Sequence, residues 1–158
     1  MNMKVGMIIY SRTGNTLSVA EKLKASLLDA GHTVCLARVT AVNEDPNAKG
    51  PVRLINAPGI LGYDHVIFGA PVQAFSLSPI MKAYLAQLAK MDGIKTTCFV
   101  TQHFPKAWMG GRQAIKHMLN RIGERGGIVT ETGIVNWTNK EREQQIAEVV
   151  SALGTISG

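Results

Sequence analysis

Strands and helices alternate along the whole chain, and this alternation constrains the fold more than any other feature. Five segments have the length and apolar content of buried strands: 3–10, 32–40, 65–72, 95–101 and 127–135. Between and after them, apolar residues recur at helical spacing in segments 15–30, 79–91, 111–126 and beyond residue 138. Strands joined by helices pair in parallel and are covered on both faces. The pattern therefore predicts an α/β fold, a doubly wound five-stranded parallel sheet with helices on both faces.

The chain has 158 residues and no change of composition that would mark a linker, so we expect one domain over 1–158. Residues 41–63 are rich in proline and glycine, which predicts a loop with one short helix over 52–56. Thr138 and Glu141 have the spacing of a capping box that opens the last helix. The apolar stripes of two helices include Leu28 and Leu119, which we expect to face the core.

The formal net charge of +6 invites a nucleic-acid or acidic-partner interpretation. The basic residues lie on helices without interleaved aromatic residues, however, so nucleic-acid binding is disfavoured. We expect no export signal and no membrane span, because no apolar run reaches about 18 residues. Cys35 and Cys98 lie in apolar runs without metal-ligand spacing, which predicts buried, reduced thiols, no metal site and a cytoplasmic location.

Ligands of such sheets bind outside the carboxyl ends of the strands, so the loops after Tyr10, Val72 and Thr101 are the places to look for chemistry. The first loop is S-R-T-G-N-T, residues 11–16, in which hydroxyl groups and helix N-terminal amides can converge on one anion. The glycine-lysine pattern of a triphosphate loop and the G-x-G-x-x-G pattern are both absent. The loop therefore predicts a cradle for a single phosphate monoester, and a hydroxyl-rich capping turn is the alternative.

This strand, loop and helix resemble the FMN-phosphate loop of flavodoxins and flavodoxin-like reductases. A second landmark, Gly69 to Val72 (G-A-P-V), lies where that family runs from its third strand into the first flavin-contacting loop. Gly110-Gly111 and the helix that follows fit the region after the second such loop. The resemblance covers nearly the whole chain. It implies strand order 2-1-3-4-5 and FMN at the switch point between the first and third strands.

The resemblance also implies which residues hold the cofactor. Those expected at the phosphate are Ser11, Thr13, Asn15 and Thr16, with the amides of Arg12 and Gly14. Those expected beside the flavin ring are Pro71, Val72, Gln73, Ala74 and Phe75 on one wall, and Thr101, Gln102, His103, Phe104, Trp108, Gly110 and Gly111 on the other. His103 is the one candidate catalytic residue, as a donor to flavin or substrate, unless it is merely a solvated loop histidine. Trp137, beside a strand end, is expected in the core, and His32, His65 and His117 are expected to be structural or exposed.

Two departures from the family bear on the chemistry. Electron-carrying flavodoxins are typically acidic, whereas this chain is basic. Their one-electron members commonly have a glycine after the third strand whose peptide turns over as the flavin is reduced, and residues 73–78 contain none. Both departures favour two-electron chemistry. The expected function is therefore an FMN-dependent oxidoreductase that takes electrons from NAD(P)H and passes them to a quinone or similar acceptor.

Other interpretations stay open at this point. One is a flavodoxin-type electron-transfer protein, with a redox protein as partner and no substrate of its own. Another is a binding protein without redox function. A basic segment could attract the phosphates of NAD(P)H or an acidic protein, or could be a solvated helix face; its residues are Lys106, Arg112, Lys116, Arg121 and Arg125, with Glu124 as the one acid. Reductases of this kind are often oligomers, so a homo-oligomer with a contact through residues 41–63 is a further option.

Overall fold

Parallel strand pairing organises the molecule. A computed structural model describes residues 2–156. The five long strands are β1 (Lys4–Ile9), β2 (Thr33–Arg38), β5 (His65–Gln73), β7 (Lys95–Gln102) and β8 (Ile128–Asn136). They lie in the order β2-β1-β5-β7-β8, and every neighbouring pair is parallel. The order is 2-1-3-4-5 of the long strands, which confirms the predicted fold class and topology.

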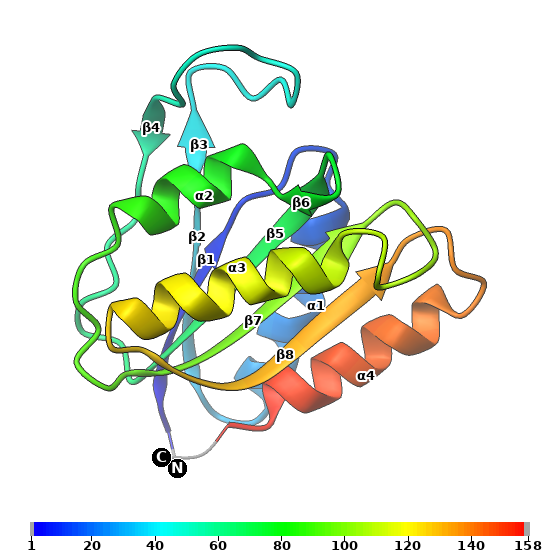
Figure 1. Ribbon diagram of the computed structural model, residues 1–158. Coiled ribbons are helices and arrows are strands. Elements are labelled where there is room, and N and C mark those ends of the chain that lie inside the picture. Colours follow the sequence, from blue (N-terminus) through cyan, green and yellow to red (C-terminus); the bar gives the residue numbers. More distant parts are fainter. Residues whose placement is uncertain (1, 157–158) are drawn as a thin grey trace.

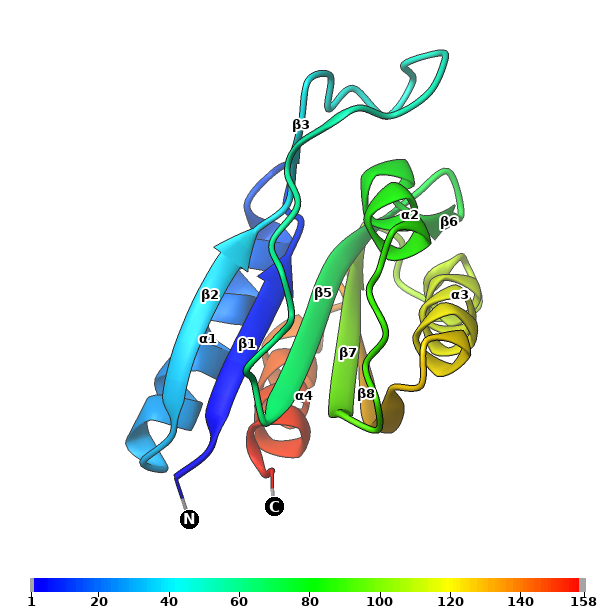
Figure 2. The same ribbon diagram turned by 90° about the vertical axis from the view of Figure 1, so that its left-hand side faces the viewer.

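Two helices cover each face of the sheet (Figures 1 and 2). Helices α1 (Asn15–Asp29) and α4 (Arg142–Gly154) lie on one face, and α2 (Pro79–Ala86) and α3 (Gly111–Glu124) on the other. Side chains alternate along each strand, so β1 supplies both cores: Met7 and Ile9 pack towards α1 and α4, and Ile8 towards α2 and α3. This two-sided burial explains why the strands are nearly continuous apolar runs.

An antiparallel arm, residues 40–56, projects beyond the carboxyl ends of the strands (Figure 2). It consists of β3 (Thr40–Ala41) paired with β4 (Leu54–Asn56) and the loop between them. The short helix predicted over 52–56 is therefore wrong. Leu54 packs against the core on the α2 and α3 face, and the extended pairing with β3 supplies its backbone hydrogen bonds.

Other local predictions are also corrected. Helix α2 ends at Ala86 rather than residue 91, because Gln87 and Leu88 donate their N–H groups three residues back and close the last turn. Helix α4 begins at Arg142, and Thr138 does not cap it, because its Oγ1 donates to the carbonyl of His103 at 2.7 Å. Leu28 and Leu119 lie at the edges of their helical stripes and are 49% and 38% exposed.

The two cysteines differ. Cys98 is buried in central strand β7, and this burial raises the pKa of its thiol to about 12. Cys35 is exposed, contrary to the prediction, because β2 is the edge strand and has no neighbour on its outer side. Both are free thiols. Residues 2–156 contain no group of three or more potential metal ligands and no helix long and apolar enough to cross a membrane.

His65 opens β5 at the amino edge of the sheet and is 2% exposed. Its Nε2 lies 3.3 Å from Thr97 Oγ1, and its Nδ1 has no hydrogen-bond partner among the described residues. Burial, with Lys95 and His32 nearby, lowers its pKa from 6.5 to about 4. The imidazole is therefore a neutral structural group, remote from the carboxyl ends of the strands.

This burial predicts an acid-dependent loss of stability. In the unfolded chain the His65 imidazole takes up a proton near pH 6.5, whereas in the folded chain it does so only near pH 4. The contribution of His65 to the free energy of unfolding is therefore fully present above pH 6.5 and is lost as the pH falls to 4. The loss approaches about 3 kcal/mol, at roughly 1.4 kcal/mol per pKa unit. Urea unfolding from pH 7.5 to 4 should therefore show a steeper decline for the wild type than for His65→Gln. Parallel declines would contradict this account.

Candidate functional site

Three loops meet at the carboxyl edge of the sheet, following β1, β5 and β7 (Figure 1). The parallel register aligns the strand ends, and the N–H of Tyr10 donates to the carbonyl of Gly69 at 3.0 Å. Thr16 Oγ1 and Thr101 Oγ1 share a buried hydrogen bond of 2.7 Å, which joins the first turn of α1 to the end of β7. The structure thus brings together the three loops that the sequence singled out.

The first loop leaves the N-terminus of α1 open. Gly14 precedes the helix with φ +96°, and no side chain caps the helix from this position. Ser11 Oγ accepts the N–H of Leu17 at 3.1 Å, so one hydroxyl does act as a cap. The N–H groups of residues 12–16 donate to no acceptor within residues 2–156. Converging N–H groups at the positive end of a helix dipole are the donor set that an oxyanion requires.

Two arginine side chains brace this loop. The Arg12 guanidinium donates to the carbonyl of Glu44 in the arm, and Arg38 Nη2, at the end of β2, donates to the carbonyl of Ser11 at 3.0 Å. These contacts bring two positive charges to the loop. Sequence reasoning missed Arg38 and the arm because both contacts span more than 25 residues and no local pattern indicates them.

The Tyr10 side chain is buried beneath the arm, and its hydroxyl has no hydrogen-bond partner among the described residues. Burial raises the pKa of this hydroxyl, and the Glu44 carboxylate adds to the rise, while Arg12 opposes it. Tyr10 therefore carries a neutral O–H group between the first loop and the arm.

The second loop is a two-residue turn between β5 and β6 (Ser76–Leu77). Ala74 and Phe75 have φ +52° and +60°, the left-handed pair of a type I′ turn, although glycine and asparagine usually occupy such positions. The turn brings Phe75 out to solvent, with 58% of the residue exposed. An L-residue with a left-handed φ is strained by about 1–2 kcal/mol.

The third loop, residues 103–110, is held by side chains at its base. Gln102 Nε2 donates to the carbonyl of Lys106 at 2.5 Å and to Asn136 Oδ1. Asn139 Nδ2 donates to the carbonyl of Pro105 at 3.1 Å, so the turn after β8 supports the loop. Gln102 Oε1 is buried and has no partner among the described residues, which leaves one acceptor free at the base of the loop.

The second and third loops touch through aromatic rings. Phe75 and Phe104 are stacked, with centroids 5.1 Å apart and planes 5° apart, and His103 meets the edge of Phe104 at 5.8 Å. Gly110, with φ +123°, permits this approach because a Cβ there would lie 2.8 Å from Phe75 Cα. Trp108 is 68% exposed and lines a shallow pocket with Phe75. The predicted ring-wall residues are therefore divided. Some lie in the second and third loops (Ala74, Phe75, His103, Phe104, Trp108 and Gly110), and the others lie at the ends of β5 and β7 or at the start of α3.

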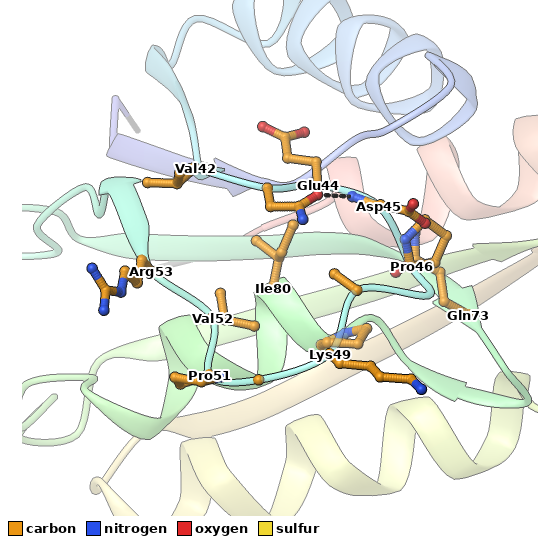
Figure 3. Close-up of a pocket in the computed structure, with 14 residues that line it drawn as sticks. Val42, Glu44, Asp45, Pro46, Lys49, Pro51, Val52, Arg53, Gln73 and Ile80 are labelled. Atoms are coloured by element: carbon orange, nitrogen blue, oxygen red, sulfur yellow. Dashed lines mark hydrogen bonds between the residues drawn. The ribbon is translucent and has the colours of Figure 1, made fainter.

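A second pocket lies between the arm and the start of α2 (Figure 3). Val52 and Ile80 supply apolar surface, Glu44 and Asp45 lie along its arm side, and Gln73 borders it from the end of β5. Because the arm consists of short strands with no periodic signal, sequence reasoning did not find this pocket.

Comparison with known proteins gives matches in structure only. No protein-family model and no curated protein sequence matches the chain. Its fold is similar to a WrbA-like flavodoxin from Agrobacterium tumefaciens, at 15% identity over 96% of this chain and 92% of that one, with a TM-score of 0.66. It is also similar to the two-electron reduced flavodoxin of Megasphaera elsdenii, at 21% identity over 93% and 98%, with a TM-score of 0.65.

A third similar structure is a flavoprotein from Lactobacillus acidophilus in complex with FMN. It is 17% identical to this chain, covers 93% of it and 98% of its own length, and has a TM-score of 0.63. At these identities the likeness shows the fold. What the site of this chain binds must be argued from its own residues.

The left-handed turn predicts that an alanine-to-glycine change at residue 74 raises the free energy of unfolding, whereas the same change inside a helix lowers it. Ala74→Gly removes a strain of about 1–2 kcal/mol and adds about 0.5–1 kcal/mol of backbone entropy cost, so it should stabilise the fold by about 0.5–1 kcal/mol. The matched change Ala83→Gly, inside α2, should destabilise the fold by about 1 kcal/mol. Urea unfolding of both variants tests the turn. A loss of stability in Ala74→Gly would contradict its geometry.

Proposed function

We propose that this chain, which has the flavodoxin-like fold, binds FMN at the carboxyl edge of its sheet and serves as an electron-transfer protein. The observation that carries the proposal is the open N-terminus of α1, where five consecutive N–H groups lack acceptors within residues 2–156. It stands beside two aromatic loops at the sheet edge where ligands of this fold bind.

The first loop fits a phosphate monoester. The N–H groups of residues 12–16 are the donors, and the left-handed Gly14 has open space where a side chain would otherwise stand. The hydroxyl groups of Ser11 and Thr13 add donors, and Arg12 and Arg38 lower the cost of holding about 1.5 to 2 negative charges. Thr16 positions the first turn of the helix through its bond with Thr101.

The second and third loops fit a flat ring with a polar edge. Phe75 and Phe104 offer parallel aromatic faces, and a ring between them requires that they separate from 5.1 Å to about 7 Å, twice a carbon contact distance. The free Gln102 Oε1 is an acceptor for a ring N–H at the base of the third loop. FMN, when bound, supplies the redox chemistry. The chain binds it, orients the ring and limits access of water to it.

The carrier function is favoured over an enzyme because most similar structures are plain flavodoxins. An NAD(P)H-dependent oxidoreductase acting on a quinone or similar acceptor is the second candidate. The turn at Ala74 supports this second candidate. If the peptide bond between residues 74 and 75 turned over, Ala74 would keep a positive φ in a type II′ turn, a position that normally requires glycine. The turn therefore disfavours the peptide movement that is expected of one-electron members of the family.

Phosphate recognition is tested by comparing FMN with riboflavin, which lacks the phosphate. Thr13→Asp places a negative charge at the exposed rim of the first loop, whereas Thr13→Asn changes the side chain without charge. At about 4 Å in water the added repulsion is about 1.5–2 kcal/mol, so the FMN affinity should fall roughly ten- to thirtyfold.

Flavin fluorescence titrations measure both ligands. Riboflavin should bind the wild type far more weakly than FMN and should be insensitive to Thr13→Asp, and Thr13→Asn should retain most of the FMN affinity. Equal affinity of the wild type for FMN and riboflavin would contradict the assignment of the first loop.

The carrier function is tested by anaerobic absorbance spectroscopy of the FMN-loaded protein. We expect no bleaching of the flavin band by NADH or NADPH alone. Rapid bleaching by NADPH should follow once a catalytic amount of a reductase with an acidic docking surface is added, such as NADPH–cytochrome P-450 reductase. Direct bleaching by either nicotinamide would instead favour the oxidoreductase. Failure of the protein to take up FMN would contradict both candidate functions.

A further inference from the structure

The net charge of the chain is confined to one part of the sequence. Residues 65–123 contain one acid, Asp92, and seven bases, which gives a formal charge of +6. The bases are Lys82, Lys90, Lys95, Lys106, Arg112, Lys116 and Arg121. The rest of the chain has ten basic and ten acidic residues, which cancel. All of the excess charge therefore lies in the segment that contains β5, α2, β7 and α3, which includes both aromatic loops.

The site end of this segment has no acidic residue. Lys106 lies in the third loop, and Arg112 and Lys116 follow on the first two turns of α3; all three are exposed and form no ion pair with a described residue. Asp92 lies at the opposite edge of the sheet, just before β7, and Arg121 is already paired with Glu124 at 2.8 Å. Uncompensated positive charge is thus concentrated beside the aromatic loops.

Exposed apolar side chains lie among these charges. Phe75 and Trp108 are 58% and 68% exposed, and together with Met109 and Arg112 they line the shallow pocket at the mouth of the two loops. Aromatic residues, methionine and arginine are the types enriched where proteins bind one another, and a large exposed apolar side chain is costly to leave in water. We call this surface, formed by Phe75, Lys106, Trp108, Arg112 and Lys116, the basic-aromatic face.

We propose that the basic-aromatic face docks an acidic electron-transfer protein. The inference rests on the proposed function, because electrons can pass only to a partner that approaches the flavin edge. Charge complementarity selects the class of partner: a carboxylate-rich surface is attracted over a Debye length of about 8–10 Å and is oriented towards the aromatic pair. Usual flavodoxins, which are acidic, would be repelled by the same partner.

A protein fits this face better than a nicotinamide dinucleotide does. The charges are spread along two turns of a helix and a loop, on exposed side chains. Neither the basic-aromatic face nor the shallow pocket beside it contains a buried polar donor without a partner among residues 2–156. A nucleotide phosphate needs such converging donors, whereas a protein surface needs only spaced charges around an apolar centre.

The test uses two purified redox proteins of opposite charge, an acidic plant-type [2Fe–2S] ferredoxin and the basic cytochrome c. Binding of the oxidised probes is measured by calorimetry, which does not depend on flavin chemistry, and electron transfer from the reduced holoprotein by stopped flow. We expect ferredoxin to bind, with an affinity and an electron-transfer rate that fall at least tenfold between about 20 mM and 500 mM salt. Cytochrome c should show no binding.

The variants separate local charge from net charge. Lys106→Glu/Arg112→Glu should lower ferredoxin binding and its low-salt electron-transfer rate at least tenfold. The control Lys24→Glu/Lys90→Glu makes the same change of net charge away from the face. It should change ferredoxin binding and the electron-transfer rate less than threefold. FMN fluorescence titration checks that both doubles keep the cofactor site, so a defect in FMN binding is distinguished from a defect in docking.

Several results would overturn the proposal. These are ferredoxin binding that is absent or insensitive to salt, equal effects of the two double variants, and tighter binding of cytochrome c. Reduction of the wild type by NADPH that is lost in Lys106→Glu/Arg112→Glu, with ferredoxin binding unaffected, would identify the face as a nucleotide site instead. A wild type that binds ferredoxin but no FMN would retain the docking face and reject the proposed function.

Discussion

The parallel pairing of β1, β5 and β7 is the constraint on which the rest of the site depends. Parallel strands must end at the same edge, so three loops from distant parts of the sequence arrive together. The Tyr10–Gly69 backbone bond fixes the first loop against the second, and the buried Thr16–Thr101 bond fixes it against the third. Without this alignment the open helix N-terminus and the aromatic loops would not form one site.

Much of this arrangement follows from local pattern. The five strands and four helices are visible in the sequence because each buries a periodic apolar face, and that period is set by neighbours a few residues away. The position of the first loop follows equally, since a small polar turn between a buried strand and an amphipathic helix leaves few other conformations. The strand order then follows from the resemblance, and the structure agrees with it.

What could not be predicted is determined by long-range contacts. Strands β3 and β4 have two and three residues, too few for a period, and they exist because they pair with each other. Thr138 has the sequence signature of a cap, yet its hydroxyl donates to His103, 35 residues away. Ala74 and Phe75 have none of the usual signals of a left-handed turn; pairing of the strands on either side fixes it. Arg38 gives no local sign of its contact with Ser11.

Charge and geometry together support both proposals, an anionic, flat cofactor in the site and a protein partner at its edge. In the proposed complex, backbone dipoles with two arginines nearby would meet the phosphate, and aromatic faces would meet the flat ring. Excess positive charge surrounds the opening rather than the phosphate loop alone. This division separates the groups that would hold the cofactor from the charges that would attract a partner.

The central claim is that the N–H groups at the start of α1 receive the phosphate of FMN. Two-dimensional 1H–15N NMR of the labelled protein tests it directly, because each amide reports its own hydrogen bond. On addition of FMN, the account predicts the largest downfield proton shifts at the amides of residues 12–16, with riboflavin leaving them nearly unchanged. Shifts confined to the arm pocket, or the same amide shifts with both ligands, would contradict it.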